Sequence, residues 1–222
     1  MNYIESFCRI KPEGVWLNGK KCFVPQQKQF EINEFFSELY RFLKIDYRKF
    51  YKMDALSKLG FLASELLLNG IDREQPKSDM GILLFNRSSS LEADMNFQKT
   101  IQDKTDFFPS PAEFVYTLPN IVTGEIAIRN KILGETAFYV MQYLKMDVII
   151  QTVEYTIYST GMKSVLAGWV EVDAFKNTPD CLMMLCTPDK AKKDGLHLLP
   201  GFEKVYAGEN IPLTMNNLYD FV

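Results

Sequence analysis

The first 43 residues carry a strand pattern followed by a helix pattern. Residues 3–10 predict an opening strand, and the turn formers Pro12 and Gly14 end it. From Gln29, aromatic and aliphatic residues recur at helical spacing as far as Leu43, with acidic residues between them. We therefore expect a helix from Gln29 that packs its apolar stripe into the core.

A second helix and a buried strand follow. Asp54 is a suitable N-cap, leucines recur on one side of the next turns, and Asn69 and Gly70 supply a C-terminal stop. Residues 80–85 form a continuous apolar run, which is typical of a strand buried on both faces of a parallel sheet. The polar residues 86–90 then predict a loop at the carboxyl end of this strand.

The middle of the chain predicts two further helices and a strand. We expect a helix over residues 94–104, a proline-punctuated loop over 107–119, and a helix that begins near Asn120 and stops at Gly134. Residues 135–141 follow as a strand. A loop, a short helix and a glycine that lead into a strand often position a catalytic residue, so the residues after Met141 are candidates for a site.

Residues 146–158 carry conflicting signals. Their many β-branched side chains favour a strand. The spacing of Met146, Ile149, Val153 and Ile157 instead fits one face of a helix, and Gly161 is placed to stop it. We predict a helix, because the spacing and the stop signal agree.

Two strands complete the patterned region. Residues 164–172 and 181–186 predict strands joined by a polar turn around 177–179, whereas residues 190–222 have weak patterning and no predicted element. Strand and helix alternate without an internal repeat. The sequence therefore predicts one α/β domain over residues 1–222.

Composition narrows the functional classes. A chain of 222 residues can bury a sizeable core, and its net charge of −3 comes from 25 basic and 28 acidic residues without a helix-spaced basic stripe. Nucleic acid is therefore not an expected partner. No leader and no uncharged run of about 20 residues is present, so we expect a cytoplasmic protein without a membrane span.

The metal-binding residue types do not form a site pattern. Cys181 and Cys186 are separated by four residues, Cys8 and Cys22 lie far from them in sequence, and His197 is the sole histidine. We expect free, mostly buried thiols and neither a bound metal nor a cofactor.

Six segments in order resemble the N-terminal half of a β-ketoacyl synthase, the condensing enzyme of fatty acid and polyketide assembly. The resemblance covers residues 52–172 and lies in the order and spacing of the segments. They are Lys-Met-Asp-Ala-Leu-Ser-Lys-Leu-Gly from Lys52, residues 80–85, Pro-Ser-Pro-Ala-Glu-Phe from Pro109, Pro-Asn-Ile-Val-Thr-Gly-Glu-Ile-Ala-Ile-Arg from Pro119, Leu-Gly-Glu-Thr from Leu133, and Val-Leu-Ala-Gly-Trp-Val-Glu from Val165.

The resemblance implies a thiolase-like half, with a mixed, mostly parallel five-stranded sheet flanked by helices. The Asn and Gly positions of the family pattern fall without gaps on Asn120, Gly124, Gly134 and Gly168. For Asn120 and Gly134 a structural role suffices, because asparagine caps helices and glycine adopts a positive φ.

The resemblance also implies where a nucleophile would stand. In the family, a catalytic cysteine follows the strand after the Leu-Gly-Glu-Thr equivalent, at the N-terminus of a buried helix. Counting without gaps places this position at Tyr143, preceded by Gln142. Neither residue is a usable nucleophile. Two readings stay open. Either Tyr143 and Gln142 have a functional role of their own, or Tyr143 simply fills space at a helix start.

The family reaction also needs two neutral donors, which come from the C-terminal half of a full synthase. The chain is about half of the family's length, and its single histidine, His197, excludes a two-histidine site. We therefore predict a catalytically inactive synthase-like protein, a partner or chain-length subunit of a condensing enzyme that depends on an acyl carrier protein.

Three alternatives stay open. One is acyl transfer through Cys181 or Cys186, or condensation completed by a second chain. Another is a module that only binds acyl carrier protein or an acyl thioester. The third is a serine nucleophile from residues 88–90 paired with His197, although the Gly-x-Ser-x-Gly pattern is absent.

A missing half would leave an apolar layer open to water, so we expect a homodimer or a heterodimer with an active ketosynthase. In the family the strand at residues 135–141 pairs with its copy across the dimer. This resemblance assigns Glu135, Phe138 and Val140 to an interface. It assigns Glu113 and Phe114 to a loop that reaches into the partner's acyl tunnel.

Overall fold

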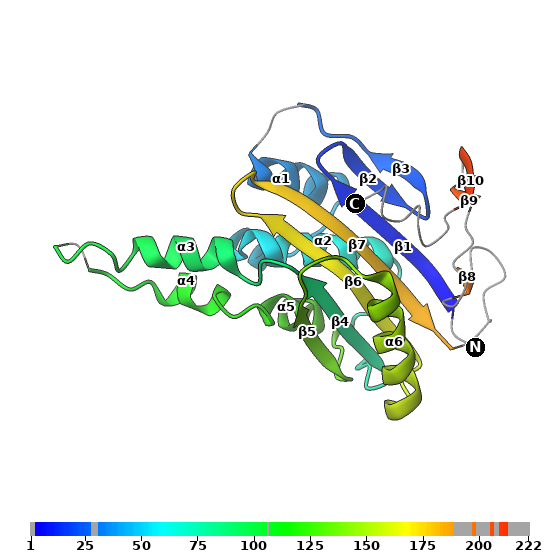
Figure 1. The fold of residues 1–222 in the computed structure, drawn as a ribbon. Helices are drawn as coiled ribbons and strands as arrows, with labels where there is room; N and C mark the ends of the chain where they lie inside the picture. The colour runs from blue at the N-terminus through cyan, green and yellow to red at the C-terminus, as the bar shows by residue number, and fades with distance from the viewer. Residues whose placement is uncertain are drawn as a thin grey trace.

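The computed structural model describes residues 3–27, 31–105 and 107–188, together with the backbone of residues 197–198, 205–206 and 209–212. One twisted sheet forms the centre of the molecule (Figure 1). Its strands are β1 (Tyr3–Lys11), β2 (Gly14–Leu17), β3 (Lys20–Phe23), β4 (Met80–Asn86), β5 (Thr136–Val140), β6 (Ser164–Asp173), β7 (Thr178–Thr187) and β8 (His197–Leu198). A separate pair consists of β9 (Val205–Tyr206) and β10 (Glu209–Pro212).

The predicted five-stranded, mostly parallel sheet is wrong in strand number and in direction. The described residues form a sheet in the order β3-β2-β1-β7-β6-β4-β5, with β8 paired to β1. Only β4 runs parallel to its neighbours β5 and β6, and the other pairs are antiparallel. The physical reason is connection length. Turns of two to four residues join β1, β2 and β3 and join β6 to β7, and such short turns allow only antiparallel pairing.

Helices cover both faces of the sheet. The helices α1 (Ile32–Phe42), α2 (Ala55–Leu67) and α5 (Ile121–Asn130) contribute to the core on one face, and α6 (Met146–Thr160) covers the other (Figure 1). A short 3-10 helix, η1 (Arg48–Lys52), connects α1 to α2. The remaining helices, α3 (Leu91–Lys99) and α4 (Pro111–Tyr116), form an arm that projects from the body.

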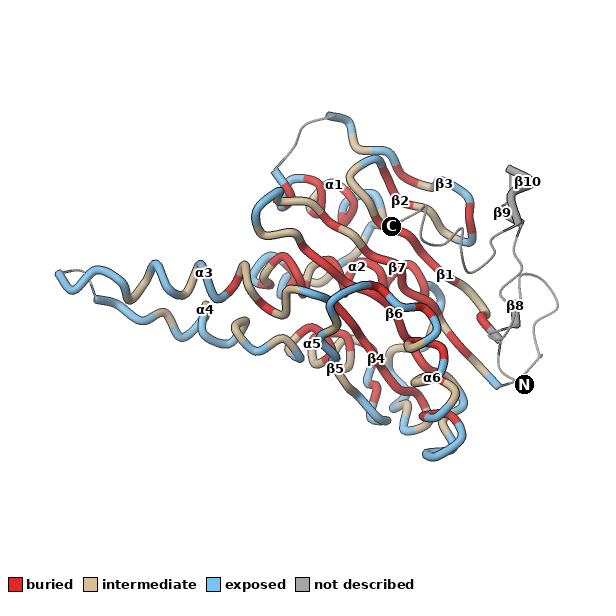
Figure 2. Tube along the Cα trace, in the orientation of Figure 1, coloured by how far each residue is buried: buried red, intermediate tan, exposed pale blue. Residues whose placement is uncertain are grey.

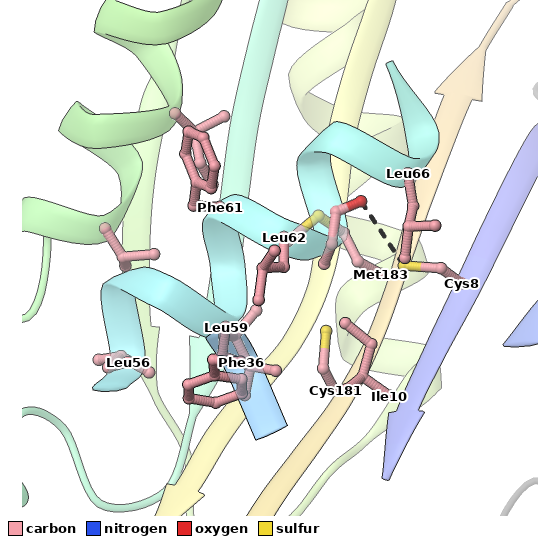
Figure 3. Packing of buried hydrophobic residues seen from close by; sticks show 14 of the residues in the cluster. Cys8, Ile10, Phe36, Leu56, Leu59, Phe61, Leu62, Leu66, Cys181 and Met183 are labelled. Atoms are coloured by element: carbon pink, nitrogen blue, oxygen red, sulfur yellow. Dashed lines mark hydrogen bonds between the residues drawn. The ribbon is translucent and has the colours of Figure 1, made fainter. Parts of the chain in front are cut away.

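The apolar side chains form one core on each face. The larger core places Phe36 of α1 and Leu59 and Leu62 of α2 against Ile10 and Met183 of the sheet (Figure 3). On the opposite face, the predicted helical stripe of α6 packs on β4, β6 and β7. Buried residues follow the central strands and α2, whereas the arm is largely exposed (Figure 2).

Several local predictions are confirmed. Asp54 caps α2 by accepting a hydrogen bond from the Ser57 backbone N–H at 3.0 Å. Strand β4 is buried at all seven positions. Helix α6 ends at Gly161, which has a φ of 72°. For this segment the helical spacing of the apolar residues predicted the structure correctly and the β-branched composition did not, because the helix buries its apolar face on the sheet.

Other local predictions need correction. Helix α3 begins three residues before the predicted start at residue 94 and ends five residues before the predicted end at 104. The predicted loop over 107–119 contains α4, which Ser110 caps by accepting the Glu113 N–H at 3.3 Å. Strands β2 and β3 lie in a segment for which no strand was predicted. None of the helices in the described ranges combines the length and apolar character needed to cross a membrane.

Candidate functional site

A groove of about 770 Å³ lies beside the N-terminus of α6, at the carboxyl ends of β4, β5 and β6. Its walls come from the β5–α6 loop, the ends of β1 and β6, the start of β7 and Arg87 in the β4–α3 loop. We call this hollow the α6 groove. Carboxyl ends of parallel strands commonly carry ligand sites in α/β proteins, so it is the best-placed candidate site.

The structure places Tyr143 and Gln142 in the wall of the α6 groove. Tyr143 is 60% exposed, whereas the adjacent Leu144 is buried at 4% exposed. Both predicted residues lie in the loop before α6, whose first residue is Met146. Their roles stay predictions, but their position beside a helix start and a groove is defined.

Glu171 is a residue of the groove that sequence reasoning missed as a site. Its side chain is almost completely buried and accepts hydrogen bonds from the backbone N–H of Arg87 at 2.7 Å and of Ser88 at 3.2 Å. The hydroxyl of Ser88 also donates to Glu171 Oε1. Glu171 thus ties the end of β6 to the loop after β4. A carboxylate that follows the apolar run Val165–Val170 in strand β6 was the available signal.

The serine loop, residues 88–90, has structural roles. Ser88 donates to Glu171, the Ser89 N–H donates to Asn86 Oδ1 at 3.0 Å, and the Ser90 hydroxyl donates to the Thr117 carbonyl at 2.6 Å. His197 lies in β8 beside Ile4, at the opposite end of the sheet from this loop. The fold therefore does not bring a serine and His197 together, and the serine alternative is wrong.

The cysteine alternative also fails on burial. Cys181 and Cys186 are fully buried, on opposite faces of β7. Figure 3 shows Cys181 inside the larger core, beside Ile10. Burial raises the pKa of the Cys181 thiol well above its ordinary value, and a nearby Cys8 thiol adds to this effect. A protonated thiol without solvent access cannot act as an acyl acceptor.

Beside the serine loop, the carboxyl group of Asp54 is unusually basic. Burial is the main cause and raises its pKa to about 6 from an ordinary value of 3.8; hydrogen bonds from Ser57 oppose the shift, and the nearby Glu92 carboxylate adds to it. The pKa of Glu92 is also raised, mainly by burial. Between pH 4 and 6 the folded protein therefore holds a proton on Asp54 that the unfolded chain releases.

We predict that Asp54→Asn stabilises the protein at pH 7.5 by about 2 kcal/mol and leaves stability at pH 4 unchanged. The sign follows from the raised pKa. Stability falls as pH rises from 4 to 6, because over this range the folded state loses a proton that it binds more tightly than the unfolded chain does. Asparagine removes this charge and keeps the acceptor for the Ser57 N–H. Urea unfolding across pH 4–8 measures the effect, with Asp46→Asn, an exposed site, as control. Parallel pH profiles for wild type and Asp54→Asn would contradict it.

Strand β5 is an open edge of the sheet, paired only with β4 among the described strands. Of the predicted interface residues, Phe138 is half-buried, Val140 is 56% exposed, and Glu135 precedes the strand and is exposed. No charged or proline residue interrupts β5. The opposite edge, β3, carries the exposed Lys20 and Lys21, a common protection against edge pairing.

Glu113 and Phe114 lie in helix α4 of the arm and not in the predicted loop. Phe114 is 53% exposed, and its ring lies 5.4 Å from that of Phe97 in α3. The arm extends past the β5 edge of the sheet (Figure 1). The structure therefore presents Phe114 on a projecting element, as a contact with a second chain would require.

The structure does not support the helix-cap and helix-stop roles expected of the predicted structural residues. Asn120 is at the N-cap position of α5, but its side chain makes no capping hydrogen bond. Helix α5 ends at Lys131, which has a φ of 53°, and not at Gly134. Position 134 has no room for a side chain, because an added Cβ on Gly134 would lie 2.2 Å from the Met80 carbonyl oxygen. Gly124 has open space around it.

Solved structures share this arrangement. A chain of the ishigamide ketosynthase/chain length factor matches with a TM-score of 0.57 and 16% identity, over 86% of this chain and 63% of that one. A chain of the ketosynthase complex with its chain length factor from Xenorhabdus doucetiae matches with a TM-score of 0.53 and 12% identity, over 85% of this chain and 79% of that one. The chain has the thiolase-like fold of ketosynthases.

A β-ketoacyl synthase from Burkholderia phymatum shares the fold with a TM-score of 0.51 and 11% identity, over 84% of this chain and 58% of that one. This chain thus spans less than two thirds of the length of that synthase and of the ishigamide chain. No protein-family model and no curated protein matches the sequence. At these identities the ketosynthase likeness concerns the fold alone.

Proposed function

We propose that this chain is a noncatalytic ketosynthase-fold subunit that acts by pairing with a second chain of the same fold. The observation that carries the proposal is the set of residues in the α6 groove. The position that the resemblance gives to the nucleophile holds the exposed Tyr143, and the buried Cys181 and Cys186 cannot replace it. Two of the similar solved structures are ketosynthases together with chain length factors, which supports pairing with a second chain.

The edge strand β5 supports pairing as the mode of action. Its uncharged residues, Thr136 to Val140, leave their outer backbone groups available to another strand. The two edges of the sheet differ, because β3 carries lysines and β5 carries none. This difference fits a sheet that pairs with another chain through β5 and not through β3. If this chain has a chain-length role, its partner is a condensing enzyme or an acyl carrier protein. Phe114 of the arm is then the residue that contacts the partner.

We expect Phe138→Lys to convert a dimer into a monomer at micromolar concentration. Phe138 is the central residue of β5, so a lysine there would place two like charges face to face across a symmetric strand pair. Sedimentation velocity of wild type and variant is the measurement. A wild-type protein that stays monomeric at every concentration would refute pairing with a second copy of this chain. Phe175→Lys, an equally polar change at an exposed site in the β6–β7 turn, is the control.

A further inference from the structure

The arm joins the body of the molecule through a narrow contact. Among the described residues of α3 and α4, Ala93 is the single buried one, so little apolar packing holds the arm in place. The Ser90 hydroxyl donates to the Thr117 carbonyl at 2.6 Å, which ties the start of α3 to the end of α4. Beyond this point the arm projects away from the sheet (Figures 1 and 2). Since Ala93 belongs to neither core cluster, the arm can move without disturbing the cores.

Two carboxylates from different elements meet where the arm begins. Asp54 caps α2 and lines a small hollow together with residues 88–93. Glu92 of α3 accepts a hydrogen bond from the backbone N–H of Ala55, the first residue of α2. We call this contact of residues 54–55 with the start of α3 the arm root. It holds a carboxylate of the body and a carboxylate of the arm at one helix N-terminus.

Positive charge at the arm root comes from Lys58, one turn further along α2. Its charge acts on both Asp54 and Glu92. The Lys58 ammonium group is directed toward α1, however, where it donates to Asn33 Oδ1 at 2.6 Å. It therefore offsets only part of the repulsion between the two carboxylates.

The groups that face the arm root from α4 and α5 add no positive charge to it. Glu113 of α4 contributes further negative charge at Glu92. Tyr116 of α4 lies near Asp54, and its hydroxyl donates to Glu125 of α5 at 3.5 Å. The other oxygen of Glu125 pairs with Lys49 at 2.8 Å. Full ionisation of the arm root is therefore unfavourable while the arm is closed.

Protonation relieves this repulsion in the closed arrangement. Burial raises the pKa of Asp54 to about 6 and also raises the pKa of Glu92, and each group has a neighbouring carboxylate that adds to the shift. The start of α3 lines the hollow at Asp54, so an open arm would admit water and return its pKa toward 3.8. The closed arm then binds the proton more tightly than the open arm does. Closure is favoured at low pH, and this advantage is lost as pH rises from about 4 to about 6.

We propose that the arm root is a pH-sensitive hinge, closed while Asp54 is protonated and released when Asp54 and Glu92 are both ionised. The inference concerns a single chain and does not depend on the pairing proposed above. The difference between a pKa of 3.8 and one of about 6 allows the open-to-closed ratio to rise by about a hundredfold at most. Because Phe114 moves with the arm, the hinge makes its position depend on pH.

Hydrogen exchange followed by mass spectrometry tests the hinge. Exchange rates of the α3 amides at pH 4.5 and 7.5, corrected for the intrinsic effect of pH on exchange, give the extent of arm opening at each pH. We expect opening of the wild-type arm to increase at least tenfold between these pH values. The α3 amides should also exchange faster than the β6 amides, since the arm opens while the sheet stays folded. Opening that does not change with pH, or α3 amides that exchange only as slowly as β6, would overturn the proposal.

Substitutions identify the groups that titrate. We expect Asp54→Asn to remove most of the increase, and Asp54→Asn combined with Glu92→Gln to hold it below twofold. The amide side chains carry no charge and can still accept hydrogen bonds from the α2 N-terminus. Asp46→Asn, which alters an exposed carboxylate in the loop before η1, is the matched control and should keep the tenfold increase. A tenfold increase that persists in the double variant would contradict the hinge.

Phe138→Lys separates the hinge from pairing. We expect the same increase in arm opening in this variant, because Asp54, Glu92 and the arm belong to one chain. An increase that occurs in wild type and is absent from Phe138→Lys would assign the pH dependence to pairing and overturn the hinge. An increase in a wild-type chain that sedimentation shows to be monomeric would keep the hinge and refute pairing with a second copy.

Discussion

Gly168→Ala is expected to lower the free energy of unfolding by about 3 kcal/mol or more. An added Cβ would lie 2.2 Å from the Leu182 carbonyl oxygen and 2.6 Å from the Met183 Cα. Both atoms belong to the backbone of β7, so no side-chain rotation relieves the clash. Strand β6 lies between β4 and β7, and a shift of either pair would disturb both cores.

Gly124→Ala is the matched control for this substitution. Gly124 lies inside α5, and an added Cβ there would have no heavy atom within 4 Å. Alanine should therefore stabilise the protein by about 0.5–1 kcal/mol, because it favours the helix and restricts the unfolded chain. Urea unfolding measures both variants. A Gly168→Ala variant as stable as wild type would show that β6 and β7 do not approach each other so closely at this position.

Glu65→Ala is expected to cost about 3 kcal/mol of stability, the second large effect. Glu65 is a buried residue of α2 that accepts from Arg73 Nη2 at 3.0 Å and from Arg129 Nε at 3.2 Å and Nη2 at 3.3 Å. The Arg129 guanidinium also lies 4.8 Å from the centre of the Tyr47 ring. Removal of Glu65 leaves two arginines, 27% and 18% exposed, without their shared carboxylate.

The exposed pair of Glu74 and Lys131 supplies the control. Its ions lie 2.8 Å apart, but the two side chains are 86% and 44% exposed, so Glu74→Ala should change stability by less than about 0.5 kcal/mol. Denaturant unfolding of the two alanine variants gives the comparison. If Glu65→Ala and Glu74→Ala cost the same, burial of the Glu65 carboxylate between two arginines would have no energetic role.

The sequence predicted the elements whose signals are local. The carboxylate of Asp54, the continuous apolar run of β4 and the stop at Gly161 each act within one element, so pattern and capping chemistry located them. The sheet was predicted less well, because strand direction depends on pairing between distant residues. The short turn at Pro12 and Gly14 contained the necessary information, since two-residue connections give antiparallel neighbours.

The candidate site was predicted in part for the same reason. Counting from the resemblance placed Tyr143 and Gln142 near a helix start, and the structure puts them on a groove there. The role of Glu171 was missed because it depends on the loop after β4, more than 80 residues away. The arm was predicted as a loop at Phe114, because Pro109, Pro111 and Pro119 obscured the capped helix α4.

The proposed function requires above all that the chain carries no acyl-accepting residue. Intact mass spectrometry after incubation with acyl-CoA and acyl-carrier-protein thioesters of several lengths tests this requirement most directly, with an active ketosynthase as positive control. We predict an unmodified mass for this protein with every thioester. A stoichiometric acyl adduct that maps to one residue would contradict the noncatalytic function and would make the protein an acyltransferase.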